Sequence, residues 1–359
     1  MHDLYTHNRN WGARIHEFVF RGHRMVSLEN RFLRIVIVAD KGTDIIEFLY
    51  KPLDVDFMWH SYAGLRSHTG TIPTSPNPAG PFLDYYPGGW QELFPSAGMD
   101  CTYRGAALGI HGEVCLLPWD YRIERDDPDE VSVSFSVRTI RTPFHLQKKL
   151  TLSAESAALF LEETVCNESG EVLDFMWGHH PAFGWPFLDD SCRILLPECT
   201  VITPPDYTAP SSRLEKDQQK PWPMVKGRSG SIIDLSHIPG PEAASHDMAY
   251  MTGFHPGWYA IVNDRQKVGF GLSWDEKTFP FLWFWQVYRG GVGYPWFHSA
   301  YVIALEPVSS YKSPLTAAIE AGTQLALGPR EERTTRLTAV AFSGQEVVKG
   351  IDLSTGRIL

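Results

Sequence analysis

Short runs of β-branched and aromatic residues, separated by turn-forming residues, restrict the possible folds of this chain more than any other feature. In residues 131–138 (VSVSFSVR) apolar and polar side chains alternate, which is typical of a strand with one face in solvent. Comparable runs occupy residues 31–38, 45–50, 145–152, 158–165, 172–177, 258–262, 268–274, 281–287, 301–305 and 336–342. We expect each of these runs to form a strand.

Turn residues lie between these runs, and helical periodicity is rare. NESGE (167–171) and NDRQK (263–267) separate neighbouring runs, and the second predicts a hairpin turn. Residues 315–321 are one of the few windows with a helical pattern, and 26 Pro and 30 Gly are spread through the chain. The sequence therefore predicts an all-β fold with antiparallel sheets.

The size of the chain allows a large core, because 43% of its 359 residues are hydrophobic. Domains commonly hold about 100–200 residues, but all-β sandwiches run longer as one unit, and we expect a single domain over residues 1–359. Residues 60–98 and 203–241 interrupt the strand pattern with Gly, Pro and polar residues. Loops of this length inside a compact domain are usually functional.

The charge pattern excludes several classes of partner. The formal net charge is −10 and no basic run occurs, which argues against nucleic acid and against an anionic membrane surface. Residues 1–20 contain no uninterrupted apolar segment, so we expect no signal peptide. Apolar stretches such as residues 279–285 are far too short to span a membrane. We expect a soluble cytoplasmic protein, and no pattern specifies its oligomeric state.

The cysteines and histidines give no metal-binding pattern. The five cysteines form no CxxC pair and leave an odd number, which favours free thiols in a reducing compartment. Several histidines lack the HxH and HExxH spacings of zinc sites, among them His237, His246, His255 and His298. We therefore expect no metal site.

Four short clusters follow one another along the chain: GGWQELFPSAG (88–98), GIHGEV (109–114), WGHHPAFG (177–184) and ALEP (304–307). Each contains Gly or Pro and lies in or beside a strand-like or loop segment. Loops on a rigid scaffold tend to carry the working groups of a protein. The clusters are therefore the first candidates for a functional site.

In residues and order, these clusters resemble motifs of the galactose mutarotase-like superfamily, which includes aldose 1-epimerases and hexose-6-phosphate epimerases. The family's GG-x-P-x-x-FP-x-x-G stretch is similar to residues 88–98, and its HG pair with a following Trp is similar to residues 111–119. Its strand that ends in a His is similar to residues 177–184, and its strand that ends in Glu-Pro to residues 304–307. The resemblance spans residues 15–345 and implies a large antiparallel β-sandwich, the galactose mutarotase-like supersandwich, that binds carbohydrate.

The resemblance also implies a reaction, the interconversion of the α and β anomers of a sugar. By the family's pattern Glu306 is the base that removes the proton of the anomeric hydroxyl, and His180 is the acid that protonates the ring oxygen. His111 would hydrogen-bond the ring or an adjacent hydroxyl. Such a general acid and general base each contribute about 10²–10⁴-fold, and no metal or redox cofactor is required.

The doublet His179–His180 has two interpretations. Strand alternation sends the two rings to opposite faces, so at most one of them can line a given pocket. His180 directly precedes Pro181, as the family's histidine often does, and is the preferred acid. His179 remains the alternative acid. Whichever histidine does not line the pocket is expected to have a structural or supporting role.

Several further residues are expected to bind the sugar. Many mutarotases have an Asp before a hydrophobic strand where Asp247 stands, although Asp247 is equally consistent with an ordinary loop acid. Some of the tryptophans must be core, and one or two could stack on a pyranose, the candidates being Trp90, Trp283, Trp285 and Trp296, of which Trp90 and Trp285 are preferred. Trp283 and Trp285 should share one face of a strand.

Two departures from the family pattern concern the substrate. Gln91 replaces the family's Pro, and the adjacent acid Glu92 is an additional candidate for substrate binding. The arginine that many members place on a sugar hydroxyl could be Arg66 or Arg104, of which Arg104 is the preferred candidate. A phosphorylated sugar would require a pair of cations, for which Arg289 and Arg104 are available, and a neutral aldose or a sugar acid is equally consistent.

Two other functions fit the same resemblance. A non-catalytic sugar-binding protein could have this fold, because a fold does not fix a function. A glycoside-processing enzyme on a related sandwich would need two carboxylates, for which Glu306 with Glu92 or Asp247 is the available choice.

Overall fold

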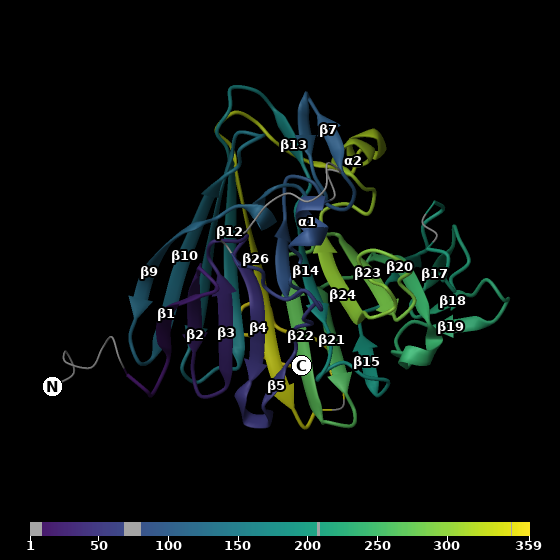
Figure 1. The fold of residues 1–359 in the computed structure, drawn as a ribbon, viewed down its shortest axis with the longest axis horizontal. Helices are drawn as coiled ribbons and strands as arrows, with labels where there is room; N and C mark the ends of the chain where they lie inside the picture. The colour runs from purple at the N-terminus through teal and green to yellow at the C-terminus, as the bar shows by residue number, and fades with distance from the viewer. Residues whose placement is uncertain (1–8, 68–79, 207–208, 346) are drawn as a thin grey trace.

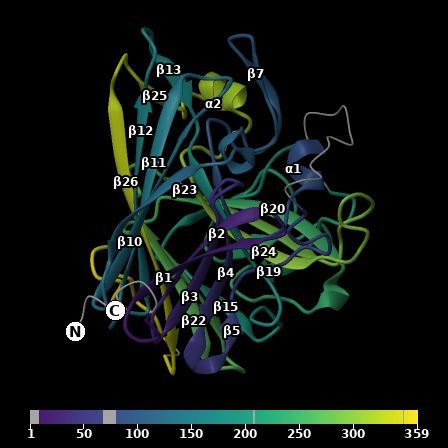
Figure 2. The same cartoon turned by 60° about the vertical axis from the view of Figure 1, so that its left-hand side comes forward.

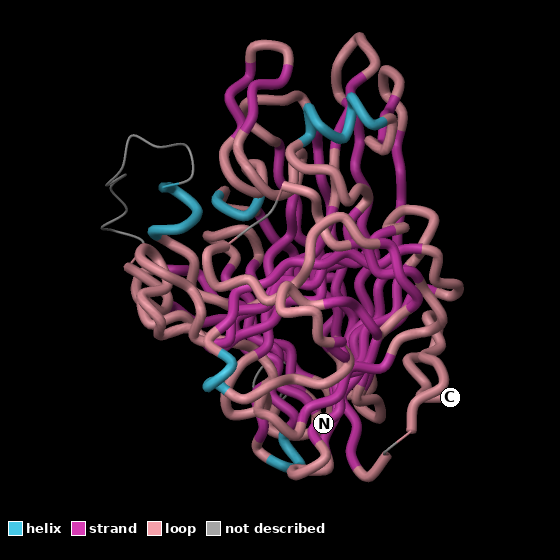
Figure 3. The backbone as a smooth tube through the Cα atoms, turned by 90° about the vertical axis from the view of Figure 1, so that its right-hand side faces the viewer, coloured by secondary structure: helices cyan, strands magenta, loops and turns pink. Residues whose placement is uncertain are grey.

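The computed structural model describes residues 9–67, 80–206, 209–345 and 347–359. Two large antiparallel sheets make up most of this part of the chain (Figures 1 and 2). Strand dominates the backbone, and the few helical turns lie at its periphery (Figure 3). None of the described helices is long and apolar enough to cross a membrane.

The larger sheet has twelve strands in the described residues, and its central strands β14, β24, β23 and β20 carry the candidate site. In spatial order its strands are β1 (Arg14–Phe20), β2 (His23–Glu29), β3 (Leu33–Val38), β4 (Asp44–Tyr50), β6 (Trp90–Leu93), β14 (Gly178–Phe183), β24 (Tyr301–Val308), β23 (Phe281–Tyr288), β20 (Ser245–Thr252), β16 (Thr200–Ile202) and β17 (Gln219–Pro221), with β5 (Val55–Asp56) paired to β4.

The second sheet has eight strands in the same part of the chain and covers the inner face of the first. In spatial order they are β15 (Cys192–Leu195), β21 (Gly257–Asn263), β22 (Val268–Trp274), β26 (Glu332–Ser343), β12 (Ala158–Asn167), β11 (Phe144–Ser153), β10 (Glu130–Arg138) and β9 (Asp120–Asp126).

Small elements decorate the two sheets. Three two-stranded ribbons are formed by β7 (Cys101–Tyr103) with β8 (Ala106–Leu108), β13 (Leu173–Phe175) with β25 (Leu325–Leu327), and β18 (Met224–Lys226) with β19 (Ile232–Asp234). The helical segments are α1 (Gly80–Asp84), α2 (Leu315–Ala321), η1 (Lys51–Leu53), η3 (Val114–Leu116) and η4 (Pro241–Ala243).

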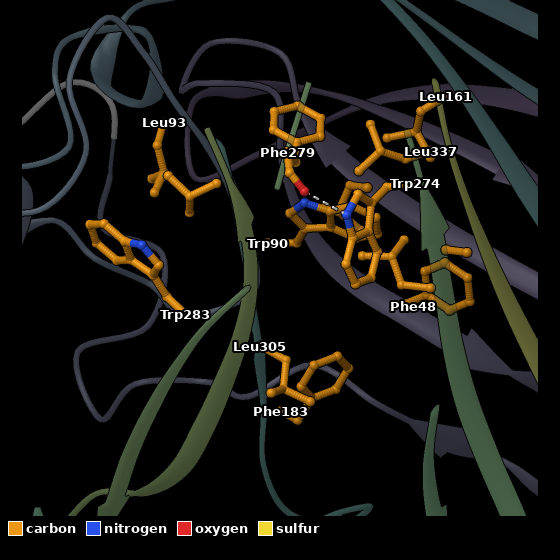
Figure 4. Close-up of a cluster of buried hydrophobic side chains, with 14 of the residues drawn as sticks. Phe48, Trp90, Leu93, Leu161, Phe183, Trp274, Phe279, Trp283, Leu305 and Leu337 are labelled. Carbon is orange, nitrogen blue, oxygen red and sulfur yellow. Dashed lines mark hydrogen bonds between the residues drawn. The ribbon is translucent and has the colours of Figure 1, made fainter. Parts of the chain in front are cut away.

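The main hydrophobic core lies between the two large sheets. Phe48 of the larger sheet meets Phe270 of the smaller one with ring centroids 5.2 Å apart. Trp274 is buried in the same cluster, where its indole N–H donates a hydrogen bond to the carbonyl of Phe279 at 2.9 Å (Figure 4). Burial of aromatic surface on this scale is what the alternating strand pattern predicts.

The all-β prediction is confirmed, since every predicted strand run contains a strand and residues 315–321 form α2. The predicted NDRQK hairpin joins β21 to β22. All five cysteines lie in the described part of the chain and carry free thiols, as expected. Of the two segments that interrupt the strand pattern, residues 60–98 contain α1 and β6, and residues 203–241 contain β17, β18 and β19. Residues 68–79 and 207–208 of these segments lie outside the described residues.

Two strand boundaries were predicted wrongly. Glu306 was expected at the end of a strand, but β24 continues to Val308 and Glu306 lies inside it. Asp247 was expected in a loop before a strand, but it is the third residue of β20. In both places a polar residue in the middle of a buried strand looks like a strand end in the sequence.

Candidate active site

A cavity of about 270 Å³ opens on the outer face of the larger sheet. Strands β14, β24, β23 and β20 form its floor, and α1 and the loops around Gly98 and Ile110 form part of its wall. Its ionisable lining residues are Tyr86, His111, His180, His246, Tyr250 and Glu306. Five segments far apart in sequence therefore bring these groups together.

Strand register places Glu306 beside His180. The flanking pairs Gly178–Val308 and Ala182–Ala304 of the antiparallel strands β14 and β24 put His180 opposite Glu306. His180 Nε2 lies 3.5 Å from Glu306 Oε1. This geometry brings an imidazole and a carboxyl group within reach of one ligand.

Both members of the pair are buried, with exposed fractions of 5% for His180 and 2% for Glu306. Burial raises the pKa of Glu306 well above its usual value, because the charged carboxylate is the form that loses hydration. Burial also lowers the pKa of His180 to about 4. Burial therefore favours the uncharged form of both groups, a carboxylic acid beside a neutral imidazole.

The remaining contacts of the pair leave part of it available to a ligand. The Tyr86 hydroxyl lies 3.3 Å from His180 Nδ1 and fixes that side of the ring. Glu306 Oε2 is buried and has no hydrogen-bond partner within the described residues. A buried oxygen without a partner is uncommon in proteins, and one that lines a cavity is suited to a ligand hydroxyl.

His111 and His246 add two further neutral imidazoles. The backbone N–H of Gly98 donates to His111 Nδ1 at 3.1 Å, which leaves Nε2 of the neutral ring as a donor. Burial and the neighbouring His180 lower the pKa of His111 well below its usual value. His246 Nε2 accepts a hydrogen bond from the Trp285 indole at 3.0 Å, and burial lowers the pKa of His246 to about 4.

Aromatic and sulfur-bearing side chains cover most of the remaining wall. Trp283 and Trp285 both line the cavity from β23, as their spacing predicted. Trp296 lies against Trp285 with ring centroids 5.1 Å apart, and Phe82 lies against His111 at 4.6 Å. Among the described residues that form this wall there is no Lys, Arg or Asp. An apolar wall with few polar groups is typical of a small-molecule site.

Three of the residues predicted to bind substrate lie between the sheets instead, namely His179, Trp90 and Glu92. His179 faces away from the cavity, where its Nε2 lies 2.9 Å from the carboxylate of Glu163. Its Nδ1 accepts a hydrogen bond from the indole N–H of Trp90 at 3.2 Å. Glu92 lies 2.7 Å from the ammonium group of Lys148, which is 3.7 Å from Glu163. We call this group (Glu92, Lys148, Glu163 and His179) the inner ionic cluster.

Asp247 and Arg104 also lie away from the cavity wall. Asp247 points to the other face of β20, where its carboxylate accepts hydrogen bonds from the guanidinium of Arg213 at 2.7 Å and from the hydroxyl of Ser212 at 2.9 Å. Arg104 is at an exposed turn and pairs with Glu171 at 2.8 Å. Of the nine predicted site residues, the cavity is lined by Glu306, His180, His111 and Trp285.

Several lining residues were not among the nine predicted site residues, above all Tyr86, His246 and Trp296. His246, Met248 and Tyr250 share one face of β20 with period two and all three line the cavity. Had SHDMAYMT been recognised as a strand, alternation would have placed His246 and Asp247 on opposite faces, so that only one of them could line the cavity. Tyr86 and Trp296 come from loops whose course no sequence periodicity specifies.

The sequence of the chain matches a known protein family over most of its length. A family model described as a domain of unknown function, DUF4432, matches residues 20–340. The chain belongs to the DUF4432 family. A comparison of its sequence with curated proteins gives no match.

Solved structures show the fold of this DUF4432 chain. A Klebsiella pneumoniae protein, provisionally named an aldose 1-epimerase, aligns over 90% of this chain and 80% of its own, with a TM-score of 0.70 and 16% identity. A galactose mutarotase related enzyme from Lactobacillus acidophilus aligns over 91% and 100%, with a TM-score of 0.59 and 18% identity. A galactose mutarotase-like protein from Clostridium acetobutylicum aligns over 92% and 99%, with a TM-score of 0.58 and 14% identity. The DUF4432 chain therefore has the galactose mutarotase-like fold, as predicted.

The lowered pKa values predict how stability of the DUF4432 chain depends on acid. In the unfolded chain His180 and His246 bind protons near pH 6.5, whereas in the folded chain they do so near pH 4. The unfolded state thus binds more protons in this interval, and stability falls as the pH falls from about 6.5 to about 4. We expect His246→Gln to remove on the order of 3 kcal/mol of this pH-dependent loss.

Urea unfolding at pH 7 and at pH 4.5 measures this contribution. The matched control is His298→Gln, which removes an exposed imidazole from a loop outside the cavity wall. If the free energy of unfolding falls equally between pH 7 and pH 4.5 in the wild type and in His246→Gln, the predicted contribution of His246 is wrong.

Proposed function

We propose that this chain is an aldose 1-epimerase that interconverts the α and β anomers of an uncharged sugar. The observation that carries the proposal is the cross-strand pair of His180 and Glu306, 3.5 Å apart at the floor of an aromatic cavity. Burial separates the pKa values of the two groups, so that one carboxylic acid faces one neutral base. The fold shared with mutarotase-like proteins agrees with this chemistry.

The proposed reaction moves two protons and needs no other group. Neutral His180 takes the proton of the C1 hydroxyl while protonated Glu306 gives its proton to the ring oxygen, and the bond between C1 and that oxygen breaks. The open aldehyde turns about the C1–C2 bond. On closing, Glu306 takes the proton back from the hydroxyl, and His180 returns its proton to the aldehyde oxygen, which leaves both groups as they began.

In this order of proton transfers Glu306 is protonated before the reaction and acts first as the acid. The family resemblance instead makes His180 the acid. The two descriptions contain the same number of protons, and each group acts as acid in one half of the cycle and as base in the other. Burial favours the uncharged pair, because a carboxylate and an imidazolium would both lose hydration. His111 and the unpartnered oxygen of Glu306 would contact the sugar hydroxyls.

The absence of a cation from the described cavity wall predicts which sugars react. A uronate or sugar phosphate would bury its charge without a partner, which costs several kcal/mol. We expect kcat/KM for neutral aldoses to exceed that for uronates and hexose 6-phosphates by at least about 10-fold.

Saturation-transfer NMR on a panel of neutral hexoses, pentoses, uronates and hexose phosphates tests both proposals, with the exchange rate without protein as the baseline. Faster exchange of a charged sugar would contradict the predicted preference. Binding without accelerated exchange of any sugar would show a sugar-binding protein rather than an epimerase.

A further inference from the structure

A second cavity of about 220 Å³ adjoins the catalytic cavity. The two meet at Leu83, Tyr86 and Trp296, whose side chains line both. The Tyr86 hydroxyl is 3.3 Å from His180 Nδ1. A ligand held at the Glu306–His180 pair therefore lies one side chain away from the second cavity.

The volumes suggest that the two cavities form one binding site. Small-molecule sites usually have volumes of about 300–1,000 Å³. The catalytic cavity at about 270 Å³ and its neighbour at about 220 Å³ each fall below this range, and the two joined fall inside it.

A row of aromatic rings runs from one cavity into the other. Trp285 in the catalytic cavity lies 5.1 Å from Trp296, and Trp296 lies 6.2 Å from Trp59 in the second cavity. These are distances between ring centroids. The neighbouring rings are tilted by 48° and 52° to one another and form a continuous apolar wall, which suits the apolar faces of linked sugar rings.

The polar groups of the second cavity suit hydroxyl groups rather than a charged ligand. The guanidinium of Arg66 donates a hydrogen bond to the carbonyl of Asp84 at 2.7 Å, and the hydroxyl of Tyr294 donates to the Asp84 carboxylate. Arg66 and Tyr294 are exposed, and both line the cavity with Asp84. A sugar hydroxyl both donates and accepts, so it can use the cation and the carboxylate together, whereas an anion would be repelled by Asp84.

We propose that the second cavity binds a further sugar ring, so that the substrate is the reducing end of a disaccharide or longer saccharide. The proposal rests on the proposed epimerase activity for the reaction, but the binding site itself is independent of it. The reducing ring would occupy the catalytic cavity with its C1 at the Glu306–His180 pair. The ring linked to it would pass Trp296 and lie among Trp59, Arg66, Asp84 and Tyr294.

The experiment compares reducing disaccharides with the matching monosaccharide. Anomer exchange of maltose, cellobiose and lactose is measured beside that of glucose, and the ratio of kcat/KM for each disaccharide to that for glucose is the readout. We expect at least one disaccharide to exceed glucose about 10-fold. Tyr294→Ala and Arg66→Ala, both at exposed positions, should each lower that ratio at least about 3-fold.

Val292→Ala is the matched control, because Val292 is an exposed residue of the same loop that is absent from the walls of both cavities. It should leave the ratio unchanged. Ratios near one for all three disaccharides, or ratios that neither Tyr294→Ala nor Arg66→Ala lowers, would overturn the proposal while the epimerase assignment stands.

A binding measurement keeps the two proposals distinguishable. If no sugar shows accelerated anomer exchange, saturation-transfer difference NMR on the same disaccharides follows the protons of the non-reducing ring. Saturation of these protons in the wild type, lost in Tyr294→Ala and kept in Val292→Ala, supports the second sugar site without the epimerase activity. No saturation of the non-reducing ring overturns the site.

Discussion

Glu306→Gln is expected to slow anomer exchange by about 10²–10⁴-fold, the contribution of one positioned acid or base. The amide keeps the shape of the side chain and removes the proton that the ring oxygen must receive. Because Glu306 is buried and its pKa is raised, the neutral amide should replace the neutral acid without unfolding the protein. Loss of exchange with an unchanged urea midpoint would separate catalysis from stability.

A second variant tests whether Glu306 and His180 act as a pair. His180→Gln should be impaired to a similar extent. The double variant should be hardly slower than either single variant, because groups that act as a unit give strongly non-additive effects. If the fold-losses of the two single variants multiply in the double variant, Glu306 and His180 act independently. A folded Glu306→Gln protein that keeps more than about a tenth of wild-type exchange would place the reaction elsewhere.

Lys148→Met is expected to lower the free energy of unfolding by about 3–5 kcal/mol, the usual effect of removing one partner from a buried ion pair. Lys148 is buried between Glu92 and Glu163, at 2.7 Å and 3.7 Å from their carboxylates. Without the ammonium group Glu92 loses its cationic partner, and Glu163 keeps only the imidazole of His179, in a low-dielectric interior. Urea unfolding at pH 7 measures the loss.

The adjacent residue gives a matched control for this variant. Lys149 is exposed on the opposite face of β11, so Lys149→Met should change stability by no more than about 0.5 kcal/mol. Adding Glu92→Gln and Glu163→Gln to Lys148→Met should recover part of the loss, since the amides remove the unpaired charges. A Lys148→Met protein as stable as the control would show that the inner ionic cluster does not support the fold.

The sequence predicts the fold well because strand alternation is a local signal. Residues 131–138 and 268–274 both alternate large apolar side chains with small or polar ones, and both are strands of the second sheet. The same rule separates His179 from His180, since adjacent strand residues face opposite sides. The sequence cannot say which side is the core, because both rings end up surrounded by aromatic residues.

The errors in the site come from long-range pairing. Glu92 looks like a ligand-binding acid in its loop-like segment, and its partner Lys148 is distant in the chain. Asp247 likewise pairs with Arg213, which lies 34 positions away in the chain. Only the folded chain shows that these charges are already neutralised, and so only the structure separates them from Glu306.

The division between strand floor and loop wall makes this site modular. Glu306 and His180 are fixed by a backbone ladder at the centre of the sheet, whereas Asp84 comes from α1, and Tyr294 and Trp296 from the segment between β23 and β24. The proposed reaction and the proposed choice of sugar therefore depend on separate stretches of chain. Under the proposed function, grafting residues 289–300 from one relative to another should change the preferred saccharide and leave the acid–base pair of Glu306 and His180 in place.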